Sequence, residues 1–114
     1  MNQKVKQLNA LKDITELKSE MSRAKLSIHR AEIDGIDAVM REVRAARATT
    51  AAGTLMQAAA ADRYAIWAAK RSDALKADLA MAMARAQPVK EMAAKDEARS
   101  QVIKRLIKDQ KRQH

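Results

Sequence analysis

The chain has no cysteine, no phenylalanine, one proline and two glycines among its 114 residues. Without cysteine it can form neither a disulfide nor a thiolate metal site, and this composition is compatible with a reducing compartment, so we expect a cytoplasmic protein. Because so few residues break or turn a helix, the backbone has few places to change direction, and a few long helices are expected. One tryptophan and one tyrosine are the only aromatic residues, so the chain can fill a thin seam between helices but not a thick core.

Long apolar runs are also missing. The N-terminal stretch MNQKVKQLNALKD lacks the continuous apolar segment of a signal peptide, and no run approaches the roughly 20 apolar residues that a bilayer span requires. The sequence therefore predicts neither secretion by that route nor a membrane-spanning helix. What is abundant instead are helix-favouring residues, chiefly alanine, lysine, arginine, leucine, methionine, glutamine and glutamate.

Apolar or small residues in the first half recur at alternating spacings of three and four, which places them on one stripe of a helix. This pattern predicts a coiled-coil seam formed by Ile14, Leu17, Met21, Ala24, Ile28 and Ala31. After Gly35 the pattern resumes one position later, at Ile36, Val39, Val43 and Ala46. We interpret the segment as one continuous helix with a bend or a close helix contact at Gly35. The alternative is a break into two helices.

The segment ATTAAGTLMQ contains two adjacent threonines, then Gly53 and Thr54, which can end one helix and cap the next. We expect a tight turn at about residues 51–54. Beyond the turn the three-four alternation runs for about five heptads, through Ala58, Ala61, Ala65, Ala68, Ser72, Leu75, Leu79, Ala82, Ala86, Val89 and Ala93. Asp96 and Ser100 interrupt its apolar character, and Ile103 and Ile107 restore it in the same phase.

Pro88 lies inside this second helix and lacks the amide that would bond back to residue 84. It should either kink the helix or open a second start near Gln87, and the unbroken phase across it favours the kink. Together these patterns predict an all-α fold, an elongated antiparallel two-helix coiled-coil hairpin with an Ala-rich seam. We expect a single domain over residues 1–114, with helices at about 3–50 and 55–112 and a kink near residue 88.

The formal net charge is +9, from 23 lysines and arginines against 14 aspartates and glutamates, and such an excess attracts anionic partners. Much of it lies near the C-terminus, in an amphipathic basic arm with an apolar stripe of Val102, Ile103, Leu106 and Ile107. The arm's candidate partner-binding residues are Arg99, Lys104, Arg105, Lys108, Lys111 and Arg112. The arm could enter a groove on a protein or lie on anionic lipid, or it could be a solvated helix end with ordinary positive charge.

Tyr64 and Trp67 are three residues apart and share a helix face beside the expected seam. With Arg63 and Arg71 they form a second candidate patch for binding a protein partner, because aromatic residues and arginine often anchor interfaces. The alternative is that the two rings widen the core opposite residues 39–43.

No catalytic constellation is visible. His29 and His114 are far apart in sequence, there is no Gly-rich phosphate loop, and the carboxylates mostly have lysine or arginine at helical spacing. We therefore expect no enzymatic activity, metal, cofactor or small-molecule substrate. His29 is interpreted as a solvated histidine that flanks the seam.

The order of LNALKDITELK, the turn near ATTAAGT and the closing helix that ends in AAKDEARSQVIKRLIKDQKRQH resembles the FliJ and YscO family of the bacterial type III export apparatus. This resemblance implies a stalk that couples a hexameric export ATPase to the membrane export gate, in flagellum assembly or virulence secretion. The joined termini would insert into the ring, with residues 99–112 facing it. The protein would then be cytoplasmic and peripheral to the inner membrane through its partners.

Two other classes of function stay open. The first is a generic coiled-coil adaptor or oligomerisation module, monomeric or homodimeric, that self-associates through its Ala-rich seam. The second is a basic protein that binds a membrane surface or nucleic acid, although the chain has no recognised motif for reading nucleic acid.

Overall fold

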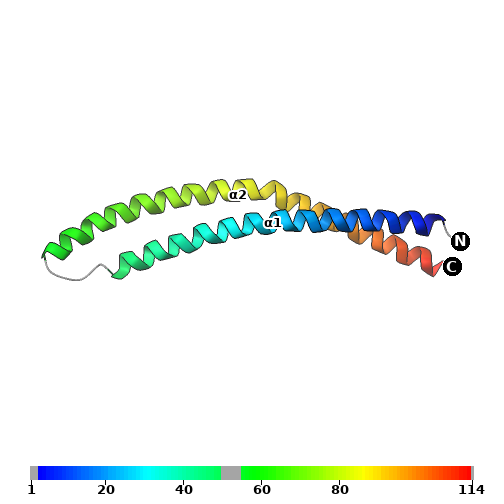
Figure 1. Cartoon of the computed structure of the whole chain (residues 1–114), viewed down its shortest axis with the longest axis horizontal. Coiled ribbons are helices and arrows are strands. Elements are labelled where there is room, and N and C mark those ends of the chain that lie inside the picture. The colour runs from blue at the N-terminus through cyan, green and yellow to red at the C-terminus, as the bar shows by residue number, and fades with distance from the viewer. Residues whose placement is uncertain (1–2, 50–54, 114) are drawn as a thin grey trace. The chain divides into compact units, whose positions relative to one another are not determined.

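The computed structural model describes residues 3–49 and 55–113, which form two long α-helices (Figure 1). Helix α1 spans Gln3–Thr49 and helix α2 spans Leu55–Arg112. The described residues contain no strand. The predicted all-α helical hairpin is thereby confirmed, while the turn expected at residues 51–54 lies outside the described residues. Neither helix, over its described length, is long and apolar enough to cross a membrane.

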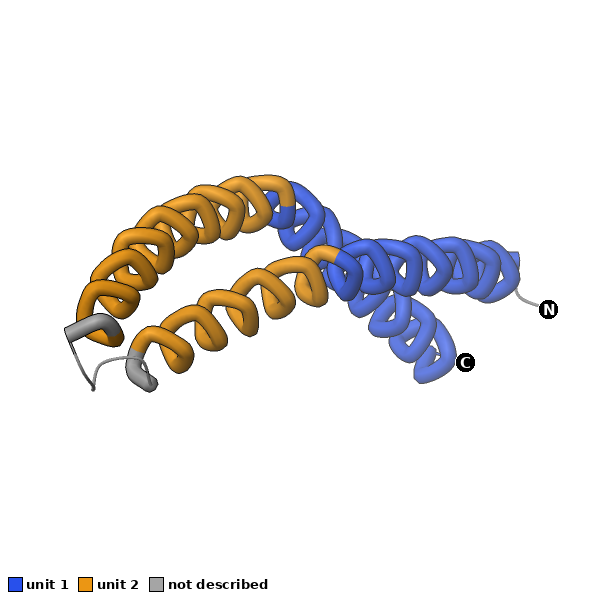
Figure 2. Tube along the Cα trace, turned by 60° about the vertical axis from the view of Figure 1, so that its left-hand side comes forward, with its two compact units in different colours: residues 1–28, 86–114 blue, residues 29–85 orange. Residues whose placement is uncertain are grey.

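The chain divides into two compact units, each built from one segment of each helix (Figure 2). Unit 1 combines Met1–Ile28 with Ala86–His114, and unit 2 comprises His29–Arg85. The two helical segments of each unit pack side by side and run in opposite directions. Each unit is therefore a short stretch of antiparallel coiled coil.

Helix α2 packs through the stripe that the sequence predicts. Its buried apolar residues are Ala68, Leu75, Ala82, Ala86, Ala93 and Ile107. Asp96 and Ser100, which interrupt the apolar pattern, are buried in the same phase. The Ala-rich seam is therefore confirmed for this helix, except that Ala58 at its beginning is exposed.

Helix α1 packs through a different face from the one predicted for its first half. Ile14, Leu17, Met21 and Ile28 are 52–70% exposed, and the alanines of the predicted seam, Ala24 and Ala31, are exposed as well. The stripe that is buried or partly buried instead consists of Val5, Leu8, Lys12, Thr15, Ser19, Ser22, Leu26 and His29, and Glu16 is partly buried beside it. The two stripes are two positions apart, which is about 200° around a helix, so they lie on nearly opposite faces.

The continuity of α1 explains this difference. The observed seam keeps the three-four alternation from Leu26 through Ile33, Ile36 and Met40 to Val43, whereas the predicted seam must slip by one position near Gly35. In an uninterrupted regular helix, residues at this spacing stay on one face along the whole length, so a seam that shifts by one residue would turn to another face.

Unit 2 has the larger apolar core. Met40, Val43, Ala68 and Leu75 form a buried cluster, against which four partly buried side chains pack. These are Ile36, Val39, Tyr64 and Leu79. The second half of the α1 prediction, from Ile36 to Ala46, is thus correct, since these residues are partly or fully buried.

Gly35 and Pro88 both lie inside uninterrupted helices. A Cβ atom added at Gly35 would meet no atom within 4 Å, and the residue is exposed, so the expected close helix contact is not there. Helix α2 continues through Pro88, so a second helix start near Gln87 is excluded.

Gly35→Ala should raise the free energy of unfolding by about 0.5–1 kcal/mol, because alanine loses less backbone entropy in a helix and meets no neighbour here. Urea denaturation followed by circular dichroism measures the change. The matched control is Ala38→Gly at an exposed site one turn further on, which should lower stability by a similar amount. A destabilised Gly35→Ala variant would show that the glycine is required where it stands.

Candidate protein-binding surfaces

Polar side chains occupy the helix seam in unit 1. The Ser19 hydroxyl donates a hydrogen bond of 2.8 Å to Glu97 Oε2, and the Ser22 hydroxyl donates one to Asp96 Oδ2. Ser19, Ser22 and Asp96 are all buried, and together with Glu97 we call them the polar layer. A buried carboxylate without a donor is costly, so these bonds determine which face of α1 can meet α2.

Glu97 stays ionised within this layer. Hydrogen bonds from the Gln101 amide and the Ser19 hydroxyl lower the pKa of Glu97 below its ordinary value, and the positive charges of Arg23 and Lys104 act in the same direction. The contribution of these contacts to folding stability is therefore fully present above the ordinary pKa of a carboxyl group. It is lost as the pH falls through the lowered pKa of Glu97. At neutral pH the carboxylate is a permanent acceptor for Ser19.

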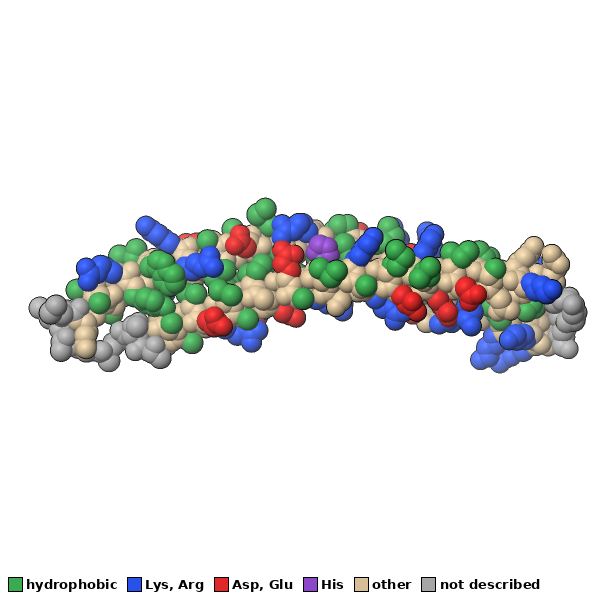
Figure 3. Space-filling model, viewed as in Figure 1, with side chains coloured by type: hydrophobic (Ala, Val, Ile, Leu, Met, Phe, Trp, Pro, Cys, Tyr) green, Lys and Arg blue, Asp and Glu red, His purple; other side chains and the backbone are tan. Residues whose placement is uncertain are grey.

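The face of α1 opposite this polar layer is apolar and exposed. We call Ile14, Leu17, Met21, Ala24 and Ile28 the outer stripe; all five are exposed and belong to unit 1. In Figure 3, apolar side chains follow the N-terminal part of α1 between basic side chains on one edge and acidic side chains on the other. The stripe has the spacing of a coiled-coil seam, but among the described residues α2 packs on the other side of the helix.

The charged side chains of the basic arm are exposed. Its six candidate residues, Arg99, Lys104, Arg105, Lys108, Lys111 and Arg112, all lie on the surface of α2 in unit 1. Lysine and arginine side chains gather over the C-terminal end of α2 (Figure 3). Unit 1 contains 14 basic and 7 acidic residues, and unit 2 contains 9 and 7, so unit 1 carries most of the positive charge.

A groove in unit 1 brings part of this arm together with α1. It is lined by Lys12, Glu16, Lys104, Ile107, Lys108 and Lys111. Lys104 Nζ lies 3.6 Å from Glu16 Oε1, which ties the two helices together at this point. We call this the basic groove, and four of its six lining residues are lysines.

A second hollow in unit 1 is lined by Lys4, Gln7, Leu8, Leu11, Leu106 and Gln110. We call this the apolar hollow. Leu11 and Leu106 are each nearly half exposed there. The arm's apolar stripe is thus divided, because Ile103 and Ile107 face the seam, whereas Val102 and Leu106 face outward.

The aromatic patch lies in unit 2, whereas the basic arm belongs to unit 1. Tyr64 is partly buried against the core cluster, so its ring widens the core, as the alternative interpretation held. Trp67 is 51% exposed, and its ring centroid is 5.4 Å from that of Tyr64. Arg63 and Arg71 are exposed.

His29 is partly buried, so the interpretation of it as a solvated histidine was wrong. It occupies a seam position, and its Nδ1 is buried without a hydrogen-bond partner among the described residues. Within the same residues there is no group of three histidine, aspartate or glutamate side chains placed to hold a metal ion.

Comparison of the chain with protein-family models, curated proteins and solved structures finds no match. The resemblance to the FliJ and YscO family therefore rests on the sequence pattern alone.

The sequence predicted the basic arm and the residues of the outer stripe, but it assigned that stripe to the seam with α2 and did not predict the polar layer. One signal was present: Ser19 and Ser22 share a phase with Leu26, Ile33 and Met40, which requires no slip at Gly35. The more hydrophobic stripe, with Ile14 and Leu17, was predicted as the seam instead, because isoleucine and leucine are more common seam residues than serine.

Ser22→Ala should lower the free energy of unfolding by about 1–3 kcal/mol, because it leaves the buried Asp96 carboxylate without its donor. Chemical denaturation at pH 7 measures the loss. Ser27→Ala, at an exposed position of the same helix, should change stability by less than about 0.5 kcal/mol. Equal losses of stability for Ser22→Ala and Ser27→Ala would contradict a stabilising role for the hydrogen bond between Ser22 and Asp96. The double variant Ser22→Ala, Asp96→Ala should lose less stability than the sum of the losses measured for the two single variants.

Proposed function

We propose that the protein is a non-enzymatic coiled-coil adaptor that binds an acidic protein partner through unit 1. The observation that carries this proposal is the combination, in one short helix pair, of the basic groove and the apolar hollow. The lysines of the groove supply positive charge, and Leu11 and Leu106 supply exposed apolar surface. Protein interfaces combine an apolar centre with complementary charge in this way.

The composition of unit 1 favours a protein over nucleic acid. Proteins that bind single-stranded nucleic acid stack bases on aromatic side chains, and the chain's two aromatic residues, Tyr64 and Trp67, both belong to unit 2. An apolar hollow adds nothing to contacts with phosphate groups. A protein side chain, in contrast, can fill it.

The surface of the basic arm disfavours a lipid bilayer as the arm's partner. A helix that lies on a membrane turns a broad apolar face toward the acyl chains. In the arm, Ile103 and Ile107 are turned into the seam, so only Val102 and Leu106 face outward. We infer an acidic amphipathic helix as the partner, with carboxylates for the groove and one large apolar side chain for the hollow.

Charge reversal tests this proposal. The variant Lys108→Glu, Lys111→Glu, Arg112→Glu should lose the partner protein in a pull-down from nuclease-treated cell lysate, read by mass spectrometry. The control Arg44→Glu, Lys70→Glu, Lys76→Glu makes the same change of charge on exposed residues of unit 2 and should still recover the partner protein. Equal recovery with both variants would contradict binding at the groove, and recovery of nucleic acid alone from untreated lysate would favour the polyanion class.

A second candidate is the export stalk that the sequence resembles. It is supported by the packing of the first segment of α1 against the last segment of α2 in unit 1, next to the basic arm. In such a stalk, unit 1 would enter the ring of a hexameric export ATPase, and residues 99–112 would face the ring.

An activity measurement tests the stalk. The purified protein, added to a hexameric type III export ATPase, should raise the rate of ATP hydrolysis, and the Lys108, Lys111, Arg112 reversal should abolish that increase. If the protein does not stimulate ATP hydrolysis, or if the reversed and control variants stimulate it equally, the stalk function is contradicted. The general adaptor function then stays as the proposal.

A further inference from the structure

Helix α1 has two coiled-coil seams on nearly opposite faces within unit 1. The first, which includes Ser19, Ser22 and Leu26, packs on α2. The second is the outer stripe, and it repeats at the same three-four spacing with larger apolar side chains than the first. A helix with seams on opposite faces is suited to lie between two other helices.

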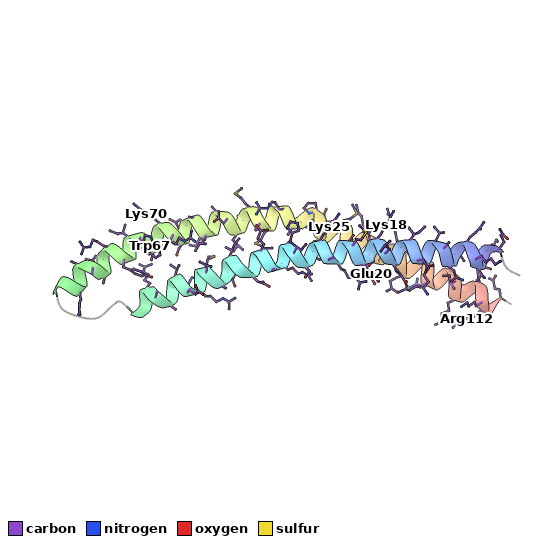
Figure 4. The ribbon with its side chains drawn as sticks, in the orientation of Figure 1. Lys18, Glu20, Lys25, Trp67, Lys70 and Arg112 are labelled. Carbon is purple, nitrogen blue, oxygen red and sulfur yellow. The ribbon has the colours of Figure 1, made fainter. Side chains whose placement is uncertain are left out.

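Opposite charges flank the two edges of the outer stripe. Asp13 and Glu20 each precede a stripe residue, whereas Lys18 and Lys25 each follow one, so the acidic and basic pairs lie on different edges. In Figure 4, Lys18 and Lys25 project from one side of α1 and Glu20 from the other. None of these four residues forms an ion pair within the part of the chain that the structure describes.

This pattern is self-complementary in only one orientation. In a parallel pair of helices, a residue that precedes the seam lies beside the residue five positions further along on the partner helix. Asp13 would then meet Lys18 of a second copy, and Glu20 would meet its Lys25. Two-fold symmetry repeats both pairs, which gives four attractive contacts. In an antiparallel pair like edges meet, so lysine faces lysine and carboxylate faces carboxylate.

We propose that two copies of the chain associate in parallel through their outer stripes. The two α1 helices form the centre of the contact, and the α2 segment of each unit 1 stays on the far side of its own α1. The basic groove lies toward α2 and is left open, so this association goes beyond the proposed adaptor function and does not depend on it.

The chain has no cysteine, so single introduced thiols report the orientation directly. Ile14→Cys should form a disulfide-linked dimer under mild oxidation, because the two copies of residue 14 face each other in the parallel pair. A mixture of Ile14→Cys and Ile28→Cys chains should give each self-linked dimer with no excess of the mixed product. Ala98→Cys, at an exposed position on α2, is the control and should stay largely monomeric.

Sedimentation equilibrium of the full chain supplies the affinity. Lys18→Glu with Lys25→Glu should weaken the dimer about tenfold or more, because four opposite-charge pairs become like-charge pairs. Adding Asp13→Lys and Glu20→Lys in the same chain should restore it. Leu17→Glu should give a monomer with unchanged helix content, since Leu17 is exposed in the single chain. A wild-type monomer at all concentrations, a preference for the mixed 14–28 disulfide, or a dimer unaffected by Leu17→Glu would overturn the proposal.

Discussion

The hydrogen bond between Ser22 and the buried carboxylate of Asp96 is the constraint on which the rest of unit 1 depends. A carboxylate in a helix seam needs a donor, and α1 supplies one only when Ser22 and Ser19 face α2. That rotation puts Leu26 into the same seam. It also turns the outer stripe away from α2, so one polar contact determines both what the hairpin buries and what it exposes.

The energetic balance of unit 1 supports the proposed association with a second copy. Fully burying a leucine, isoleucine or methionine contributes about 1.5–3 kcal/mol, whereas a buried polar pair contributes little net stability compared with well-packed apolar residues. Apolar burial alone would therefore place Ile14, Leu17 and Met21 against α2. The polar layer instead specifies the register of the two helices, and the apolar surface is left available for a second copy, whose charged edges match.

Sequence patterns predicted α2 better than α1 for a physical reason. The predicted stripe of α2 is continuous, and even Asp96 and Ser100 keep its phase, so its seam could be predicted directly. Helix α1 carries two stripes of the same period, and their ranking depends on the partner side chains across the seam. The basic arm was predictable from charge alone, but the apolar hollow was not, because it requires Leu11 and Leu106 from opposite ends of the chain to lie side by side.

The rotation of α1 about its axis is the central claim, and the labelling rate of single cysteines tests it most directly. Leu26 is 8% exposed and Ile28 is 70% exposed, although they are two residues apart. In protein diluted until it sediments as a monomer, Ile28→Cys should react rapidly with a thiol reagent and Leu26→Cys far more slowly. Rapid reaction of Leu26→Cys with protection of Ile28→Cys would show that the outer stripe is the true seam and would contradict the account.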